Sequence, residues 1–394
     1  MDYNETLNYI NNTPKFSKIL GNDDLKKLLE SFGNPQNSLK FIHIAGTNGK
    51  GSVCAMLSAI LQKAGYKTGL YISPYIEVFN ERIQINGENI SDNDLAEIAT
   101  LVKDRISEMN IEISVFAQIT AIAFIYFARN KCDYVVLETG LGGRLDATNV
   151  IEAPTICAIT KIGLDHTEFL GNSIAKITAE KCGIIKNNIP VVTCGNQENE
   201  ALSVLKRYCK DNLSDLYIAP PECDYELSLN GEYQKYNAAV AAEIAHLLHI
   251  SEEDIKYGLS HSHWIARFEF LQDNLLLDGG HNPDGIKALL TSLKALNRPV
   301  HFVVAMMEDK DFSESAKLLR SFGGKITITQ INMPRCINVA TLAPLFPGCI
   351  TEENCIAAVE NALKGCTENE IVCVCGSLYL AGEIRSYFKK HSCQ

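Results

Sequence analysis

The chain has 394 residues, 46% hydrophobic and 21% charged, which is usual for a globular enzyme with material for two or three domains. Its formal net charge of −11 argues against unspecific binding to nucleic acid, because such binding needs a surplus of Lys and Arg. An acidic protein can still hold an anionic substrate in a local loop.

The N-terminus and the cysteines indicate a cellular location. The first residues, MDYNETLNYI, contain no basic region followed by an apolar stretch, so we expect no signal peptide. No run of about 18 apolar residues predicts a membrane span. The 14 cysteines have no C-x-x-C spacing, which favours reduced core thiols over disulfides or a metal cluster. We therefore expect a cytoplasmic protein with no membrane partner. We also expect a monomer with no nucleic-acid partner, although no feature of the sequence shows the oligomeric state.

Apolar, β-rich runs alternate with helical stretches in the first half of the chain. The expected strands are 41–45, 68–73, 133–138, 155–160 and 190–193. The expected helices are 50–64, 92–108, 115–130 and 173–187. Short apolar strands separated by helices predict a mainly parallel sheet that is covered on both faces.

A second alternation of strands and helices follows residue 270. Its expected strands lie within 274–280, 300–306, 325–330 and 370–377. Between the two alternations, the segment SHSHWIARFEFL (260–271) breaks the helical pattern of 235–258 and holds the only tryptophan. The sequence therefore predicts two α/β domains, residues 1–268 and a smaller, Rossmann-like domain of residues 269–394.

The stretch AGTNGKGS (45–52) follows an apolar strand and opens a helix, as a phosphate-binding loop requires. Its glycines permit a tight turn that directs amides at phosphate oxygens, and Lys50 can reach the terminal phosphates. The usual pattern has Ser or Thr directly after the lysine, whereas here Gly51 precedes Ser52. Because Ser52 can still face the phosphates from the first helical turn, we predict a P-loop ATPase domain with an altered loop.

Further along the chain, Glu138 is a candidate metal ligand. Glu138 ends an expected strand, where a carboxylate can reach a Mg²⁺ on the phosphates, although alone it could equally be a surface carboxylate. In the same stretch, Arg144 and Asp146 could contact a substrate. Taken singly, His166 is more often structural, and Lys181 usually extends its ammonium group to water.

Five motifs in this order resemble those of the folylpolyglutamate synthase and dihydrofolate synthase family of Mur-ligase-like, ATP-dependent amide ligases. They are GTNGKGS, YISPYIEVFNERIQINGENIS, ETGLGGRLDATN, GLDHTEFLGNSIAKITAEKCGIIK and DGGHNPDG. The resemblance covers nearly the whole chain, and the extra glycine of GTNGKGS is the family's own form. It identifies residues 1–268 as a Mur-ligase-like ATP-binding domain and 269–394 as a glutamate-ligase domain.

The resemblance implies a reaction in which a carboxylate of (tetrahydro)folate, or of dihydropteroate, attacks the γ-phosphate of ATP. The amine of L-glutamate then attacks the acyl phosphate and gives an amide, ADP and phosphate. Two other hypotheses remain open, the same chemistry on a non-folate carboxylate and a nucleotide-binding protein without catalysis. A P-loop kinase is less favoured, because the second domain carries DGGHNPDG.

The resemblance also assigns roles to single residues. The catalytic residues would be Lys50, His166 and Lys181. The ATP contacts would be Asn48, Gly49, Lys50, Gly51, Ser52, Asn237, Arg267, Asp278 and His281. Two Mg²⁺ ions would be held by Ser73, Glu138, His166 and Lys181, the last as a carbamylated lysine whose added CO₂ supplies an anionic oxygen. The acceptor substrate would contact Arg82, Ser114, Phe116 and Asp146.

The sequence departs from the family in a few places. Tyr75 stands where the family often has histidine, and Ala117 stands where it has glutamate. WIAR replaces WPGR around Arg267, which loses a proline and a glycine, and DGGHN replaces DGAHN. Arg267, Asp278 and His281 belong to the second domain or to the linker, so we expect domain closure to assemble the site and exclude water. The lost glutamate at Ala117 bears on pterin recognition more than on ATP chemistry, and Tyr75 could also simply pack against its loop.

Overall fold

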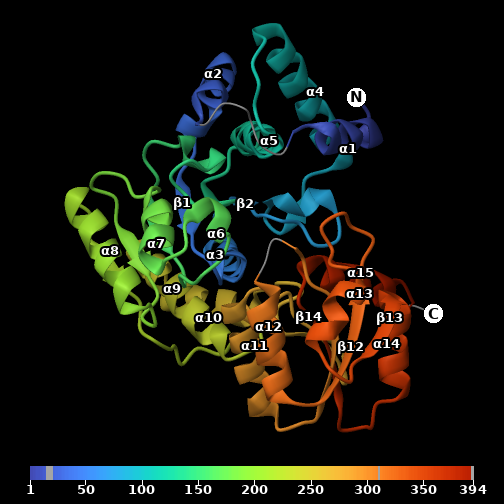
Figure 1. The fold of residues 1–394 in the computed structure, drawn as a ribbon. Coiled ribbons are helices and arrows are strands. Elements are labelled where there is room, and N and C mark those ends of the chain that lie inside the picture. Colours follow the sequence, from blue (N-terminus) through green and yellow to red (C-terminus); the bar gives the residue numbers. More distant parts are fainter. Residues whose placement is uncertain (15–20, 309–310, 392–394) are drawn as a thin grey trace. The chain divides into compact units, whose positions relative to one another are not determined.

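The computed structural model describes residues 1–14, 21–308 and 311–391, and the chain divides into two compact α/β units (Figure 1). The first unit comprises residues 1–162, 173–226 and 236–262. The second unit comprises residues 163–172, 227–235 and 263–394. The predicted fold class, two α/β domains with mainly parallel sheets, is confirmed.

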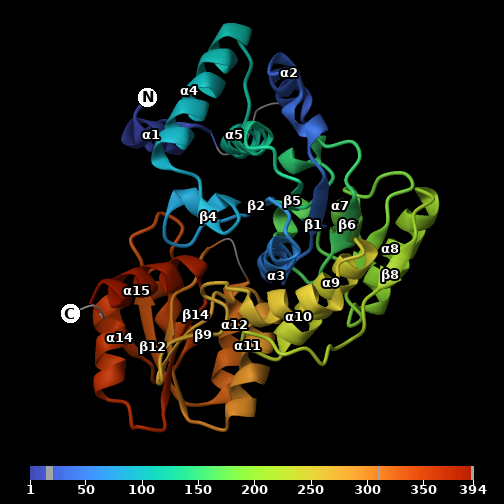
Figure 2. The same cartoon turned by 180° about the vertical axis from the view of Figure 1, so that it is seen from behind.

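The first unit contains an eight-stranded sheet with the order β4-β3-β2-β5-β1-β6-β7-β8, much of which can be followed in Figure 2. In chain order the strands are β1 (Phe41–Ala45), β2 (Thr68–Tyr71), β3 (Ile83–Ile85), β4 (Glu88–Asn89), β5 (Tyr134–Glu138), β6 (Ile156–Ile159), β7 (Val191–Thr193) and β8 (Leu216–Ile218). All pairs from β2 to β8 are parallel, and only β3 and β4 add an antiparallel edge. The carboxyl ends of β2, β5, β1 and β6 therefore lie at one edge.

Several helices of the first unit begin at a serine that caps them. The helices of this unit are α1 (Tyr3–Asn12), α2 (Asp23–Ser31), α3 (Lys50–Lys63), α4 (Asp92–Met109), α5 (Val115–Arg129), α7 (Ile174–Cys182), α8 (Asn199–Asp211), α9 (Tyr233–Leu247) and α10 (Glu252–His261). Ser91, Ser114, Ser173 and Ser251 each accept a hydrogen bond from the backbone N–H three residues on. The helical pattern of 235–258 is thus two helices, since Ser251 starts a new one. The predicted helix 173–187 already ends at Cys182.

Both faces of the first sheet are covered, which explains its continuous apolar strands. Phe41 of β1 and Leu137 of β5 belong to one core cluster with α5, and the rings of Phe41 and Phe124 lie 5.1 Å apart. Helix α3 packs against β2 and β5 from the opposite side (Figure 1). Three short 3₁₀ turns connect these elements: η1 (Pro35–Ser38), η2 (Phe79–Arg82) and η3 (Ala147–Val150).

The second unit contains a six-stranded sheet with the order β13-β12-β11-β14-β10-β9, parallel except for the β9–β10 pair. The strands are β9 (Glu269–Gln272), β10 (Leu275–Leu277), β11 (Val300–Val304), β12 (Lys325–Gln330), β13 (Ile350–Asn354) and β14 (Ile371–Cys375). The helical elements are α6 (Thr167–Leu170), α11 (Pro283–Leu296), α12 (Phe312–Phe322), α13 (Val339–Leu342), η4 (Ala343–Leu345), α14 (Cys355–Lys364) and α15 (Leu378–His391). All four strands predicted after residue 270 are present, whereas the edge strands β9 and β13 were not predicted.

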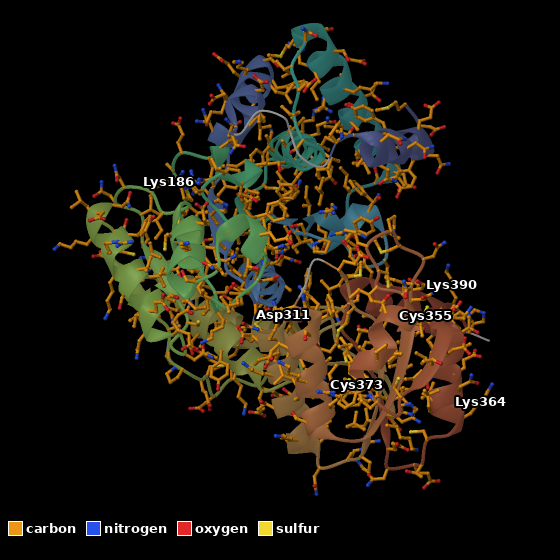
Figure 3. The ribbon with its side chains drawn as sticks, viewed as in Figure 1. Lys186, Asp311, Cys355, Lys364, Cys373 and Lys390 are labelled. Carbon is orange, nitrogen blue, oxygen red and sulfur yellow. The ribbon has the colours of Figure 1, made fainter. Side chains whose placement is uncertain are left out.

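Cysteines within the described residues are free thiols, as predicted. Cys373 and Cys375 lie on β14 in the apolar core of the second unit, and Cys373 is labelled in Figure 3. Across the described residues, no helix combines the length and apolar content needed to span a membrane.

The boundary at residues 268 and 269 remains a prediction. The compact units do not follow one cut along the chain, because residues 163–172 and 227–235 group with the C-terminal residues. This grouping depends on contacts between distant segments, which local sequence patterns do not reveal.

Candidate active site

The phosphate loop, residues 46–52, joins β1 to α3 and leaves the start of this helix open. Gly49 is the N-cap of α3 with φ of 88°, and no side chain caps the helix within the described residues. The first backbone N–H groups of a helix have no intrahelical acceptor and carry the positive end of the helix dipole. The first turn of α3, Lys50, Gly51 and Ser52, therefore presents amides suited to a phosphate.

The end of β6 determines the shape of the phosphate loop. The backbone N–H groups of Thr47 and Asn48 both donate to the carbonyl of Lys161, at 3.0 and 3.1 Å. The hydroxyl of Thr160 donates to the carbonyl of Asn48 at 2.8 Å. A Cβ atom on Gly49 would collide with the side-chain oxygen of Asn237, so only glycine permits this close approach. Asn237, a predicted ATP contact, thus lies directly against the loop.

Four predicted site residues meet at the carboxyl edge of the first sheet. The ammonium of Lys50 lies 3.9 Å from Glu138 Oε1, and the backbone N–H of Ser73 donates to Glu138 Oε2 at 3.1 Å. Lys181, only 5% exposed, donates to the carbonyl of Gly46 at 2.7 Å. They come from β5 and from the segments that follow β1, β2 and β6, because parallel strands end at a common edge.

The chemistry of this cluster suits a magnesium ion. Mg²⁺ prefers oxygen ligands and is usually bound by one or two carboxylates together with substrate phosphates. Glu138 and the Ser73 hydroxyl are such donors, beside the open start of α3. Within the described residues no group of three or more His, Cys, Asp and Glu side chains could hold a metal ion. The cluster therefore fits a Mg²⁺ that shares its coordination with phosphates, and Lys181 could contribute an oxygen only after modification.

The loop between β2 and β3, residues 72–82, carries the predicted substrate residue Arg82. Its guanidinium carbon lies 5.2 Å from the ring centre of Tyr75 and 5.7 Å from that of Phe79. Glu81, which sequence reasoning missed, shapes the loop by accepting hydrogen bonds from the N–H groups of Ile76, Glu77 and Val78.

Arg82 has an unusual electrostatic environment for an arginine. Its Nε is buried without a hydrogen-bond acceptor, and no ion pair to Arg82 occurs within the described part of the chain. Cation–π contact with Tyr75 and Phe79 stabilises the charge without neutralising it. The guanidinium is therefore suited to an anionic ligand.

The other predicted substrate residues lie around the glycine-rich loop, residues 139–146. The Phe116 ring packs on Gly140, where a Cβ atom would lie 2.5 Å from the ring, and its centre is 5.9 Å from that of Tyr71. Ser114 caps α5. Both carboxylate oxygens of Asp146 accept hydrogen bonds from its own loop region, the N–H of Leu141 among them. Substrate contacts by Ser114 and Asp146 remain predictions.

The remaining predicted site residues belong to the second unit. Asp278 is buried and accepts hydrogen bonds from the Tyr233 hydroxyl (2.8 Å) and from the N–H groups of Phe268 (3.0 Å) and Gly280 (2.7 Å). Burial raises the pKa of Asp278, while the nearby Arg267 lowers it. Asp278 therefore joins three segments of this unit and keeps Arg267 beside it. Tyr233 lies on the same helix as Asn237 but outside the five motifs, and no pattern in the sequence marks it.

His166 and His281 both lie near Asp165. Their Nε2 atoms are each 3.9 Å from a carboxylate oxygen of Asp165, which also accepts from Asn282 Nδ2 at 3.0 Å. His281 Nδ1 donates to the carbonyl of Gly279 at 2.8 Å. The segment 163–172 is thus bound to the DGGHNPDG motif within the second unit. His166 therefore belongs to the second unit, whereas Ser73, Glu138 and Lys181 belong to the first.

Comparisons with known proteins agree with the motifs. Residues 44–190 match the Mur ligase middle domain, and residues 266–378 match the Mur ligase glutamate ligase domain. The chain is 34% identical to the folylpolyglutamate synthase of Lacticaseibacillus casei, with 98% of each chain covered. It is also 34% identical to the dihydrofolate synthase/folylpolyglutamate synthase of Bacillus subtilis, over 98% of this chain and 99% of that protein. The solved structure of E. coli FolC in complex with DHPP and ADP has a TM-score of 0.91 at 26% identity and covers 100% of this chain and 99% of that one.

Proposed function

The chain belongs to the folylpolyglutamate synthase and dihydrofolate synthase family of ATP-dependent ligases, and we propose that it joins L-glutamate to the γ-carboxylate of a folate, with dihydropteroate as a further candidate acceptor. The observation that carries this proposal is the cluster of Lys50, Ser73, Glu138 and Lys181 beside the open start of α3. Such a cluster binds a nucleotide triphosphate and places positive charge on the phosphoryl group to be transferred.

ATP binds in this proposal with its phosphates on the first turn of α3. The amides of residues 50–52 hold the phosphate oxygens, and Lys50 neutralises charge that develops on the γ-phosphoryl group. Asn237 lies next to Gly49 and is a further ATP contact. The family resemblance assigns the same role to Arg267, Asp278 and His281. The ADP complex of E. coli FolC supports nucleotide binding in a protein of this fold.

Two substitution steps follow from this arrangement. A carboxylate oxygen of the acceptor attacks the γ-phosphorus, ADP leaves, and an acyl phosphate forms. The amine nitrogen of L-glutamate then attacks the acyl carbon, phosphate leaves, and the nitrogen loses a proton to give the amide. Lys50 acts in the first step, because negative charge moves there onto the departing ADP.

Glu138 and the Ser73 hydroxyl are the residues that would hold Mg²⁺ beside the phosphate loop, and the family resemblance also assigns His166 as a ligand. When bound, Mg²⁺ supplies positive charge that polarises the phosphoryl group. The Ser73 N–H and Lys50 already orient both oxygens of Glu138. Glu138→Gln should therefore reduce ligation at least about 100-fold while the far-UV circular dichroism stays unchanged. Normal turnover of this variant would show that Glu138 is not a metal ligand.

Lys181 is the proposed site of carbamylation. Its neutral amine would add to CO₂ with loss of one proton, which replaces an ammonium by an anionic oxygen donor beside the phosphate loop. The buried position of its Nζ, on the carbonyl of Gly46, keeps the group at the loop. Native mass spectrometry of the active, Mg²⁺-loaded protein should show the added mass of CO₂, and Lys181→Arg should not. An unmodified lysine in active enzyme would contradict this proposal.

On the acceptor side, Arg82 is proposed to bind a carboxylate of the folate or dihydropteroate. Its guanidinium lies near two aromatic rings and forms no ion pair within the described residues. An anionic substrate could therefore form an ion pair with it. Phe116, packed on Gly140, provides an aromatic face for the acceptor's rings.

A ligation assay followed by mass spectrometry tests the function. Purified protein is incubated with ATP, Mg²⁺ and L-glutamate, and separately with dihydropteroate, dihydrofolate or tetrahydrofolate, with Glu138→Gln as the matched inactive control. Successive glutamyl additions to a folate, and product from dihydropteroate, would support both activities. ATP turnover only with a carboxylate that is not a pterin would show that Tyr75 and Ala117 mark a changed acceptor.

We propose that the partners are these small molecules and that the protein is a cytoplasmic monomer. Light scattering after size-exclusion chromatography should give a mass near the 43.5 kDa of one chain. A mass of two chains would contradict the proposed monomer.

A further inference from the structure

A buried row of polar side chains connects β1 with the glycine-rich loop. His43 lies on β1, fully buried, with its Nε2 at 2.8 Å from the hydroxyl oxygen of Thr148. The Thr148 hydroxyl lies 2.6 Å from Asp146 Oδ1, which also accepts from the Thr148 N–H at 3.0 Å. The second oxygen of Asp146 accepts from the Leu141 N–H at 2.7 Å. The row thus runs from the strand before the phosphate loop to the loop after Glu138.

The chemistry of these groups sets the direction of each hydrogen bond. An ionised carboxylate only accepts, so the Thr148 hydroxyl donates to Asp146 and must accept from His43 Nε2–H. Burial lowers the pKa of His43 to about 3, and the charge of Lys186, labelled in Figure 3, acts in the same direction. His43 is therefore a neutral donor, with its single ring proton on Nε2.

Asp146 is the member of the row that determines the loop. Burial raises its pKa, and the hydrogen bonds from Leu141, Thr148 and Gly140 oppose that effect by favouring the ionised form. Its own backbone carbonyl accepts from Asn22 Nδ2 at 2.8 Å, which ties the loop to α2. The carboxylate thus fixes Leu141 and Gly140, and Gly140 is the residue on which the Phe116 ring packs.

The row leaves one group unsatisfied. His43 Nδ1 is buried with no hydrogen-bond partner, which is unfavourable. The residues adjacent to His43 on β1, Ile42 and Ile44, point to the opposite face of the sheet and are also fully buried. A buried imidazole with an unsatisfied nitrogen costs stability, and what it adds is the Nε2–H donor to Thr148.

We propose that His43 and Thr148 are positioning residues for the acceptor substrate, acting through Asp146 on the loop that supports Phe116. This inference rests on the proposed function. We expect His43 and Thr148 to affect binding of the acceptor and not binding of ATP, because the phosphate loop is held separately by the Lys161 carbonyl and Thr160.

The test compares Thr148→Val with a matched control, Thr327→Val. In the second unit the Thr327 hydroxyl also bonds a buried histidine, His301, at 2.9 Å, and neither residue belongs to the proposed site. Thr148→Val should raise the KM for tetrahydrofolate about tenfold, with kcat and the KM for ATP within about twofold of wild type. Thr327→Val should change none of these constants.

Two variants of His43 and a measurement without turnover complete the test. His43→Leu removes the donor and should act like Thr148→Val, whereas His43→Gln keeps an N–H donor and should restore most of the acceptor affinity. Hydrogen exchange should show lost protection of the Leu141 amide in Thr148→Val and not in Thr327→Val. The inference would be overturned if Thr148→Val left the KM for tetrahydrofolate unchanged and the Leu141 amide protected. It would also be overturned if the KM for tetrahydrofolate and the KM for ATP rose equally.

The outcomes separate this inference from the proposed function. Wild-type protein that adds glutamate to no pterin would overturn the proposed function and, with it, the acceptor role of the row. Active wild type with unaffected Thr148→Val would overturn the positioning role alone.

Discussion

The phosphate loop and the proposed acceptor side, meaning the β2–β3 loop with Phe116, are built in different ways. The backbone of the phosphate loop makes the hydrogen bonds that hold it: the N–H groups of Thr47 and Asn48 donate to the Lys161 carbonyl, and the Gly46 carbonyl accepts from the Lys181 side chain. The acceptor side is held by side chains, since Arg82 lies over two aromatic rings and Phe116 packs on Gly140. A phosphate is recognised by amides that any sequence with the right glycines can present, whereas an aromatic acid requires particular side chains.

This difference bears on two of the places where the sequence departs from its family. Tyr75 and Ala117 both lie on the proposed acceptor side, whereas the phosphate loop keeps the family's form; the departures at WIAR and DGGHN lie in neither region. A backbone turn such as the phosphate loop accepts few residue types at each position. A packed set of side chains can be replaced by another set of similar volume.

The largest effect is expected for Lys50→Ala. Loss of the ammonium beside the transferred phosphoryl group should lower the ligation rate about 1,000-fold. Lys63→Ala, in the last turn of the same helix, is the control and should retain normal activity. Coupled assays of ADP release measure both variants. A loss below tenfold would show that Lys50 does not act on the transferred group.

The backbone construction of the phosphate loop is tested by Gly49→Ala against Gly65→Ala. Both glycines have φ of +88°, so both variants meet the same backbone strain, of about 1 kcal/mol. Only at Gly49 would the new Cβ collide with Asn237, whereas nothing lies within 4 Å at Gly65. Calorimetric titration with ADP should show affinity lowered about 100-fold for Gly49→Ala alone, since the loop must move. Equal affinities of the two variants would show that the loop tolerates a side chain.

His43 lies on β1, before the phosphate loop, and bonds to Thr148 near the glycine-rich loop. Because it is buried and neutral, we expect the stability of the protein to depend on pH. Its folded pKa of about 3 lies below the ordinary 6.5, so the unfolded chain binds a proton that the folded protein excludes. The free energy of unfolding should therefore fall as pH decreases below about 6.5, by about 2 kcal/mol between pH 7 and pH 5 from this group. Urea titrations of wild type and His43→Gln at both pH values isolate the effect. The same pH dependence in both proteins would contradict a buried, neutral His43.

The smallest effect is expected for Arg82→Lys on the acceptor side. Lysine keeps the charge but loses the planar group that stacks on Tyr75 and Phe79, so the KM for tetrahydrofolate should rise about fivefold at unchanged KM for ATP. Arg129→Lys, which alters an exposed ion pair with Glu97, is the control. Steady-state kinetics with each substrate varied in turn measure the change. A rise in the KM for ATP instead would place Arg82 on the nucleotide side.

Much of the first sheet could be predicted from the sequence. The cores of five expected strands and the phosphate loop are where the pattern placed them, and Glu138 ends β5 beside β1. These features depend on local properties: runs of apolar residues, glycines with a lysine at the start of a helix, and a polar residue at a strand end. The short strands β3, β4, β8, β9 and β13 were missed, because two to five residues at a sheet edge carry little periodic signal.

The sequence by itself thus determined the fold class, the phosphate loop and the family, because each depends on residues close together in the chain. Only the tertiary structure decided that residues 163–172, with His166, pack in the second unit, that Asp146 organises its own loop, and that Tyr233 bonds to Asp278. The contacts of residues 163–172 and of Tyr233 join segments whose meeting depends on the packing of the whole unit, whereas those of Asp146 depend on how its loop turns. No pattern in the sequence marks hydrogen bonds of this kind, because each donor and acceptor could also bond to other residues.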